Sequence, residues 1–409
     1  MFSGNTLSQV IPFIIAPVIS RIFSPEEFAI QSNFLAIVGL IGVIAAGRYE
    51  LALVLPKENK KAQQLFIIGG VLTVLISILS LVLYFFQESI TELYKDKELS
   101  KYLIYIGPAI LFMGLYNILF NWMVRYKKFN LVSASRIIQS VTGNLAYAIL
   151  GYLSFGVAGL IIGWFISQII STVFLFFPAL KFWEKTEKID FKEIKLTAKE
   201  YKDFPLINSI HAFSDIFATQ FFIFWLITHE FGMLALGLFS IMNRYLRAPI
   251  QLVSGAVSQI FYREASDNYN HNISATAVLR KTFRITLFFA LPSMAIVAIF
   301  GPTLFAWYLG EQWRVAGEYA QIMTPALFVN FLSSPLSTTP LIYKKQKQAF
   351  IISILGYVLS LGVIILFSIF GYPFITALWA YSISLTIYYL VLILWYFKLI
   401  RKGNNESIN

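Results

Sequence analysis

Long apolar runs recur along the whole chain, and they restrict its possible folds more than any other feature of the sequence. Each run is roughly 18 to 25 residues long, which at about 1.5 Å per helical residue crosses a hydrocarbon layer about 30 Å thick. Stretches such as 64–86 and 350–370 lack the alternation of a transmembrane β-strand. Hydrophobic residues make up 58% of the chain and charged residues only 13%, a composition that no soluble domain buries. We therefore predict an all-α membrane protein.

The polar breaks between these runs predict about twelve transmembrane helices. They are placed near residues 2–20, 33–55, 64–86, 102–124, 131–152, 157–180, 206–228, 233–261, 278–300, 316–342, 350–370 and 374–397. Met1 leads directly into the first run with no basic segment before it. We therefore expect a first span there rather than a removed signal peptide.

Basic residues are distributed unevenly between the predicted loops. With the N-terminus in the cytoplasm, 22 lysines and arginines fall in inside loops and 5 in outside loops, leaving five arginines within spans. The positive-inside rule therefore places both termini in the cytoplasm. This topology accounts for most of the formal charge of +11, so we expect no nucleic-acid partner.

One inside loop is longer than the others and divides the spans into two groups of six. We expect an N-terminal lobe at 1–180, a cytoplasmic linker at 181–205, a C-terminal lobe at 206–398 and a cytoplasmic tail at 399–409. Transporters are often built from two related halves, with the substrate site where the halves meet. The predicted outside loops are all short, so none of them can form a catalytic domain.

The residue types of metal and hydrolase chemistry are scarce. Cysteine is absent, and the three histidines, His211, His229 and His271, are scattered over different segments. No second ligand stands at metal-ligand spacing from any of them. We expect neither a metal nor another cofactor, and no enzyme activity.

The eighth predicted span carries a polar stripe in mid-membrane. Arg244, Arg247, Gln251, Ser254 and Ser258 follow one another at steps of three and four, so they share one face of a helix. Both arginines lie several turns from either end, where their side chains do not readily reach water. Ionised groups at such depth normally face a bundle interior or a wet cavity.

The second span contains Arg48 and Glu50. A separation of two residues points them to different sides of a helix, so Glu50 needs another partner. Together with Arg244 and Arg247, three cations face only two carboxylates within the spans, Glu50 and Asp215. The uncompensated positive charge favours an anion, and phosphate suits the paired donors of arginine best.

Further polar residues lie within the spans and either line a cavity or join helices by hydrogen bonds. They are Asn5 and Gln9 in the first span, Asn117 and Asn121 in the fourth, Asn208, His211 and Asp215 in the seventh, and Asn330, Ser334, Ser337 and Thr338 in the tenth. Pro335 and Pro340 should bend the tenth span. Arg136 and Arg284 lie near inside ends, where snorkelling suffices.

At the outer end of the first span, Arg21 precedes a helix start signal. Ser24 and Glu27 have the spacing of a capping box, and Pro25 stands at the first helical position. We expect these residues to begin the second helix. Arg21 stays a candidate for a gate near the outer surface.

Several segments resemble those of the bacterial oligosaccharide flippases, the polysaccharide transporters of the MATE-like multidrug/oligosaccharidyl-lipid/polysaccharide exporter superfamily. The segments are 8–12, 16–21, 24–28, 47–56, 201–206 and 256–262. The sequence Arg48-Tyr49-Glu50 is the most specific of them, because the drug-exporting members lack it. Relatives usually carry a short basic stretch before the first span, so the natural start can lie upstream of Met1.

The resemblance implies two six-helix lobes around a central cavity that opens alternately to the two sides of the bacterial inner membrane. The cargo would be an undecaprenyl-diphosphate-linked oligosaccharide for O-antigen, capsule or exopolysaccharide assembly, with its diphosphate received by Arg48, Arg244 and Arg247. Gln251 and Arg21 complete the candidate binding residues, and Glu50 and Asp215 are the candidates for coupling to protons or sodium. We expect a monomer that works in the phospholipid bilayer beside a polysaccharide polymerase and a chain-length regulator.

Other functions remain open from the residues alone. A cation-coupled drug exporter and the flippase of a peptidoglycan precursor share the expected fold, although the latter usually has two more spans. A membrane-embedded polymerase, ligase or glycosyltransferase would need a sizeable outside loop or an acidic metal-binding loop, and neither is present in the sequence.

Overall fold

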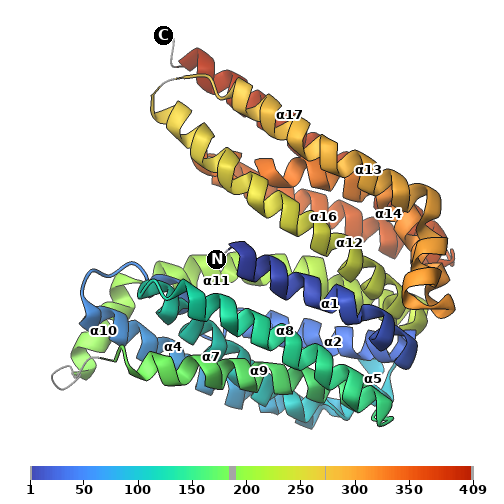
Figure 1. Cartoon of the computed structure of the whole chain (residues 1–409), viewed down its shortest axis with the longest axis horizontal. Helices are drawn as coiled ribbons and strands as arrows, with labels where there is room; N and C mark the ends of the chain where they lie inside the picture. Colours follow the sequence, from blue (N-terminus) through green and yellow to red (C-terminus); the bar gives the residue numbers. More distant parts are fainter. Residues whose placement is uncertain (1, 184–189, 272, 407–409) are drawn as a thin grey trace. The chain divides into compact units, whose positions relative to one another are not determined.

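The computed structural model describes residues 2–183, 190–271 and 273–406, and within these ranges the chain is helical, with no strand (Figure 1). The prediction of an all-α fold is confirmed. The α-helices are α1 (Phe2–Ile22), α2 (Pro25–Gly42), α3 (Tyr49–Ala52), α4 (Asn59–Ser80), α5 (Gln87–Tyr94), α6 (Lys97–Ser100), α7 (Ile106–Arg125), α8 (Phe129–Tyr152), α9 (Val157–Leu180), α10 (Phe191–Glu200), α11 (Ser209–Ile216), α12 (Phe222–Asn270), α13 (Thr276–Leu309), α14 (Arg314–Ser333), α15 (Thr339–Ile342), α16 (Gln346–Ile369) and α17 (Phe374–Glu406).

Shorter helical turns join these helices. The 3₁₀ turns are η1 (Leu81–Phe86), η2 (Leu103–Tyr105), η5 (Glu311–Trp313) and η6 (Ser334–Leu336), and the π turns are η3 (Phe204–Asn208) and η4 (Phe217–Phe221). Within the described residues, seven helical stretches are long and apolar enough to cross a membrane. All twelve predicted spans fall on helical segments, and the number of twelve membrane crossings stays a prediction.

The chain forms two compact units, Met1–Gly237 and Leu238–Asn409. The first unit therefore holds the linker helix α10 together with α11 and the beginning of α12. This division rests on packing, whereas the predicted lobes at 1–180 and 206–398 rest on the count of spans. The lobe boundaries stay a prediction.

In the first unit, α1, α8 and α9 pack side by side, and α7 packs against α4 and α9 (Figure 1). One apolar core lies around Trp122, Leu65 and Leu53, and another lies around Phe34, Ile106 and Ile110. The start of α2 is set by the predicted capping box. The amide of Glu27 donates to Ser24 Oγ over 3.3 Å, and the amide of Ser24 donates to Glu27 Oε2 over 2.7 Å.

Two predicted spans are interrupted rather than continuous. The helix expected at 33–55 ends at Gly42, and its remainder consists of turns and the short α3. The helix expected at 316–342 ends at Ser333 and continues through η6 to α15. Pro335 lies in η6 and Pro340 in the first turn of α15, so the predicted bend in this span is confirmed.

The seventh and eighth spans are joined in α12, which contains one residue with non-helical backbone angles. Gly232 has φ 86° and ψ 171°, a conformation that residues with a side chain rarely adopt. It lies between the two predicted spans.

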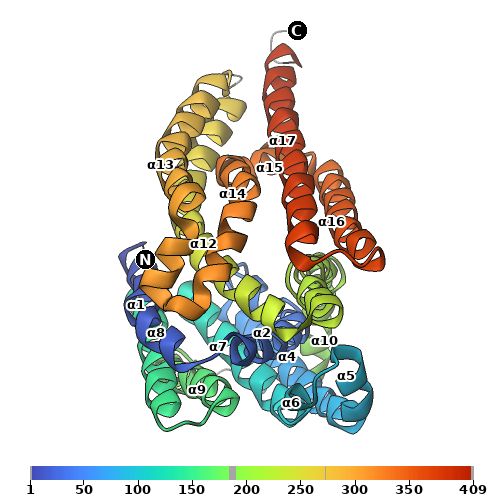
Figure 2. The same ribbon diagram turned by 90° about the vertical axis from the view of Figure 1, so that its right-hand side faces the viewer.

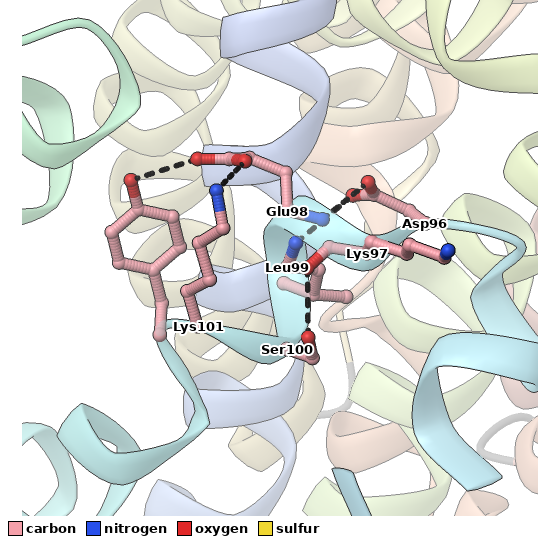
Figure 3. Close-up of polar contacts among 7 residues, drawn as sticks. Asp96, Lys97, Glu98, Leu99, Ser100 and Lys101 are labelled. Atoms are coloured by element: carbon pink, nitrogen blue, oxygen red, sulfur yellow. Dashed lines mark hydrogen bonds and ion pairs between the residues drawn. The ribbon is translucent and has the colours of Figure 1, made fainter. Parts of the chain in front are cut away.

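The connection between α4 and α7 is helical and well capped (Figure 3). Asp96 accepts hydrogen bonds from the amides of Glu98 at 2.8 Å and Leu99 at 3.1 Å, which begins α6. Glu98 pairs with Lys101 on the same short helix (Figure 3). Leu99 and Tyr94 are buried in the core of the first unit. This predicted outside loop therefore packs against its own unit.

In the second unit, α13 packs on α14, and α14 and α16 pack on α17 (Figure 2). The end of α12 joins this bundle through Phe261 and Ala265, which are buried in one core with Leu279 of α13, Leu336 of η6 and Tyr396 of α17.

Removing the N-cap of α2 should destabilise the first unit. We expect Ser24→Ala to lower the free energy of unfolding by about 1 kcal/mol, because the amide of Glu27 loses its acceptor. Thermal unfolding of the purified protein in detergent measures the change. Ser214→Ala is the control, since its hydroxyl only bonds the carbonyl of Ile210 within a helix. Equal shifts in both variants would contradict the capping role.

Candidate functional site

Arg48 stands in a turn with left-handed backbone in the first unit. Gly47 and Arg48 both have φ 59°, directly before α3. The left-handed region costs an L-residue with a side chain about 1 to 2 kcal/mol. Backbone strain of this kind persists where the surrounding structure fixes it, and it concentrates at functional sites. The turn is therefore a candidate site on conformational grounds.

Arg48 and Glu50 form a loose ion pair. Arg48 Nη1 lies 3.7 Å from Glu50 Oε1, which is longer than a hydrogen bond. Glu50 is buried, with 5% of its surface exposed, while the Arg48 side chain is 27% exposed. Within the described structure, Arg48 Nε and Glu50 Oε2 are buried and have no hydrogen-bond partner. Each group therefore keeps hydrogen-bonding capacity for another ligand.

This pair corrects the prediction that Arg48 and Glu50 point to different sides. That prediction assumed a continuous helix, in which residues two apart diverge. The left-handed backbone of Arg48 ends helical geometry there, so the two side chains approach each other.

A second arginine satisfies the backbone that follows this turn. Arg125, at the end of α7, donates to the carbonyls of Leu53 at 3.0 Å and Pro56 at 2.6 Å, and to Asn59 Oδ1 at 3.0 Å. Buried carbonyls without a partner are costly, so these bonds stabilise the interrupted helix. The sequence placed Arg125 in an inside loop and gave no indication of this role.

The linker helix α10 packs on the beginning of α4. Glu193 accepts from Lys60 Nζ at 2.8 Å and from Gln64 Nε2 at 3.1 Å, and Glu200 accepts from Lys61 Nζ at 2.9 Å.

The same helix also contacts the Arg48 turn. The hydroxyl of Thr197 donates to Gln64 Oε1 at 2.6 Å, and both residues are buried. The hydroxyl of Tyr49 donates to the carbonyl of Ala198 at 3.1 Å. The linker thus holds the residue that follows Arg48.

In the second unit, the predicted polar stripe lies on one continuous stretch of α12. Arg244, Arg247, Gln251, Ser254 and Ser258 all follow Gly232, the residue with non-helical angles, so they share one helix face as predicted. Arg244 and Gln251 are exposed, and Ser254 is buried.

Arg247 is the partly buried cation of this stripe. In the part of the chain that the structure describes, its Nε is buried and has no hydrogen-bond partner. Tyr381 of α17 is buried, and its hydroxyl lies near enough to Arg247 to interact with the positive charge of the guanidinium. The stripe therefore offers a guanidinium with unused donors.

The seventh span differs from a regular helix. Asn208 belongs to the π turn η3, while His211 and Asp215 belong to α11, and all three are exposed. Of the two carboxylates that are candidates for ion coupling, Glu50 is buried and Asp215 is exposed.

The remaining candidates lie on α1 and α14. Arg21 is exposed and donates to the carbonyl of Pro17 on its own helix at 2.8 Å. Gln9 is partly buried, and its Oε1 has no hydrogen-bond partner in the described structure. Asn330 is partly buried on α14. The side chain of Asn5 lies outside the described residues.

No group of three or more His, Cys, Asp or Glu side chains that could hold a metal ion occurs among the described residues.

The fold is similar to that of two solved membrane proteins. An inward-facing multidrug resistance MATE family transporter of the MOP superfamily matches 97% of this chain and 96% of its own, with a TM-score of 0.76 and 15% identity. The lipid II flippase MurJ in an inward closed conformation matches 100% of this chain and 90% of its own, with a TM-score of 0.75 and 18% identity.

The chain belongs to the family described as "Polysaccharide biosynthesis protein", whose sequence model matches residues 18–318. It is similar to the succinoglycan biosynthesis transport protein ExoT of Rhizobium meliloti (strain 1021), with 22% identity over 306 residues. That alignment covers 74% of this chain, and the chain spans about 60% of the length of ExoT. The protein is a multi-pass membrane protein.

Loss of the ion pairs between α10 and α4 should free the linker helix. We expect Glu193→Gln with Glu200→Gln to speed amide hydrogen exchange of α10 about fivefold, because two partly exposed pairs contribute about 1 kcal/mol together. Hydrogen-exchange mass spectrometry of the full chain measures this.

The matched control is Lys192→Gln with Lys195→Gln, two exposed lysines of α10 that form no ion pair among the described residues. It should leave the exchange rate unchanged. Faster exchange in the control, or none in the glutamate variant, would mean that other contacts hold α10.

Proposed function

We propose that this protein is a flippase that moves undecaprenyl-diphosphate-linked oligosaccharide units from the cytoplasmic to the periplasmic leaflet by alternating access. Membership of the polysaccharide biosynthesis family supports this proposal, as does the similarity to a succinoglycan transport protein. The observation that carries it is the strained turn at Arg48, whose guanidinium is only loosely paired. Such a group binds a phosphorylated headgroup with paired, charge-assisted hydrogen bonds.

Arg48 and Arg247 are the proposed ligands of the diphosphate. Arg48 in the first unit and Arg247 in the second each have a buried Nε without a hydrogen-bond partner in the described structure. Arg244 and Gln251 lie on the same α12 face as Arg247 and complete the phosphate contacts. Arg21 acts near the outer surface as a gate residue.

Glu50 couples transport to an ion gradient. While its carboxylate is ionised it attracts Arg48, and a proton or sodium ion on Glu50 releases Arg48 for the diphosphate. Binding of the ion and binding of the substrate would then favour each other. Asp215 is the second candidate for this role, at an exposed position on α11.

The protein works in the bacterial inner membrane with both termini in the cytoplasm. It supplies repeat units for O-antigen, capsule or exopolysaccharide assembly, beside a polysaccharide polymerase and a chain-length regulator.

Replacing the proposed phosphate ligands should abolish export. We expect Arg48→Ala, and separately Arg247→Ala, to reduce surface glycan at least about tenfold, because each change removes paired donors to the diphosphate. Protein abundance in the membrane should stay near normal. Immunoblots of surface glycan and of the membrane fraction measure both.

Arg48→Lys serves as the informative partner variant, since it keeps the charge without the paired donors. It should restore only part of the export. Normal export in both alanine variants would contradict the assignment of the diphosphate site.

Glu50→Gln should uncouple transport from its driving ion. In proteoliposomes, we expect wild-type transport of a lipid-linked oligosaccharide to depend on an imposed proton or sodium gradient, and Glu50→Gln to remove this dependence, because the amide does not titrate. Asp215→Asn is the comparison. Retained dependence in Glu50→Gln together with its loss in Asp215→Asn would transfer the coupling role to Asp215.

A multidrug exporter is the second candidate, because a MATE transporter has a similar fold. An exporter of this type would lower the accumulation of a cationic dye in cells. We expect no such effect here, since the two positive charges of Arg244 and Arg247 on one face of α12 repel cations. Dye export that persists in Arg48→Ala would favour this alternative. Restored cell-wall synthesis in cells depleted of their peptidoglycan-precursor flippase would favour that function instead.

A further inference from the structure

One face of α13 holds a hollow lined mainly by basic residues. Arg280 and Arg284 lie one turn apart near the first residue of the helix, and Ala277, Lys281 and Ile285 share their face at steps of three and four. These five residues line a hollow of about 420 Å³. The small side chain of Ala277 leaves space beside the guanidinium groups.

About two of the positive charges that line the hollow are not neutralised by a carboxylate. Lys281 is neutralised by Glu264 of α12, with Nζ 3.0 Å from Oε1. Arg280 and Arg284 are exposed, and neither forms a hydrogen bond or ion pair within the described parts of the chain. Snorkelling explains why such residues lie near a membrane surface, but it does not explain two unpaired guanidinium groups beside one hollow.

The same face continues as an apolar stripe. Phe288 lies one turn beyond Arg284, and Leu291 follows at the next step, with 74% and 56% of their surfaces exposed. Further along, Ile299 is 67% exposed. Only 17% of the most apolar 18-residue stretch of α13 is buried, against 50% for that of the helix ending at Arg125.

A basic hollow followed by an apolar stripe matches an amphiphile with an anionic head and a long chain. A diphosphate carries at least two negative charges, enough to neutralise both unpaired guanidinium groups, whereas phosphatidylglycerol carries one. Arginine binds phosphate oxygens with two parallel hydrogen bonds. The charge balance therefore favours a diphosphate-linked lipid over a phospholipid.

We propose that Arg280, Arg284 and the apolar stripe of α13 form a loading site that holds the diphosphate-linked lipid at the cytoplasmic leaflet before transport. Its residues differ from those of the Arg48 turn and of the α12 stripe. It rests on the proposed function for the identity of its ligand, and on the predicted topology for its side of the membrane.

The binding experiment uses the full chain with Arg48→Ala and Arg247→Ala, so that the proposed transport site does not contribute. The probe is undecaprenyl diphosphate in detergent, measured by microscale thermophoresis. In this background, Arg280→Gln with Arg284→Gln should weaken binding at least about tenfold, because paired hydrogen bonds to the diphosphate are lost. Arg280→Lys with Arg284→Lys should weaken it less, since the charge remains.

Lys345→Gln with Lys347→Gln is the matched control, because it removes the same charge from exposed positions of the same unit. It should change the affinity less than twofold. Equal losses in the control and the arginine variant, or no loss in the arginine variant, would overturn the proposal. Tighter binding of phosphatidylglycerol than of undecaprenyl diphosphate would also overturn it, in favour of a phospholipid site.

Photocrosslinking locates the chain of the bound lipid. A benzophenone amino acid replaces Phe288, and the matched control replaces Val358, which is 62% exposed and lies twelve residues after the start of α16, as Phe288 does on α13. Labelled undecaprenyl diphosphate should crosslink at position 288 and lose this crosslink in Arg280→Gln with Arg284→Gln. Equal crosslinking at both positions would indicate contact with bulk lipid and would overturn the site.

These measurements separate the loading site from the transport function. Normal export in Arg48→Ala and Arg247→Ala would contradict the proposed function, while the affinity and crosslinking results would still decide whether α13 binds the diphosphate.

Discussion

The need of every buried backbone carbonyl for a hydrogen-bond donor governs the first unit. Hydrocarbon offers no such donor, so a span that is not continuously helical must find its partners within the protein. The span after α2 is interrupted, and Arg125 provides the donors by bonding the carbonyls of Leu53 and Pro56. The left-handed turn at Arg48 lies in the same interrupted span, a few residues before these two carbonyls. The site therefore depends on an arginine that has no direct contact with the proposed ligand.

Arginine side chains have different roles in this chain. The hydrogen-bond acceptors near each guanidinium determine its role. Arg125 donates its hydrogen bonds to backbone carbonyls and a side-chain amide oxygen, so it stabilises the structure of the first unit. Arg48 faces one carboxylate at 3.7 Å and keeps unused donors. Arg280 and Arg284 face a hollow in which the nearby carboxylate of Glu264 is already engaged by Lys281. In the sequence all four arginines stand near or within a few turns of a span end. The contacts of each side chain in the structure therefore distinguish their roles.

Much of the helical framework follows from the sequence. Apolar run lengths predicted the helical segments, the spacing of Ser24 and Glu27 predicted the start of α2, and Pro335 predicted the break after α14. These signals are local, so a single segment of sequence contains them. The steps of three and four on α12 likewise predicted a shared face, because that helix is regular beyond Gly232.

The contacts that the sequence did not predict join residues far apart in the chain or depend on irregular backbone geometry. Thr197 meets Gln64 across 133 residues of sequence, and no pattern in either segment indicates that pairing. Glu50 approaches Arg48 only because the backbone leaves helical geometry. Asp215 was predicted from its depth in the span alone, but its exposure depends on which neighbours pack against α11.

The two π turns on either side of α11 give that helix an adjustable register. Each π turn accommodates one residue more than an α turn, and one residue corresponds to about 100° of rotation about the helix axis. If one π turn tightened to α geometry while the other widened by one residue, the eight residues of α11 would rotate together while α10 and α12 kept their positions. His211 and Asp215 would then face a different neighbour without any helix sliding through the bilayer.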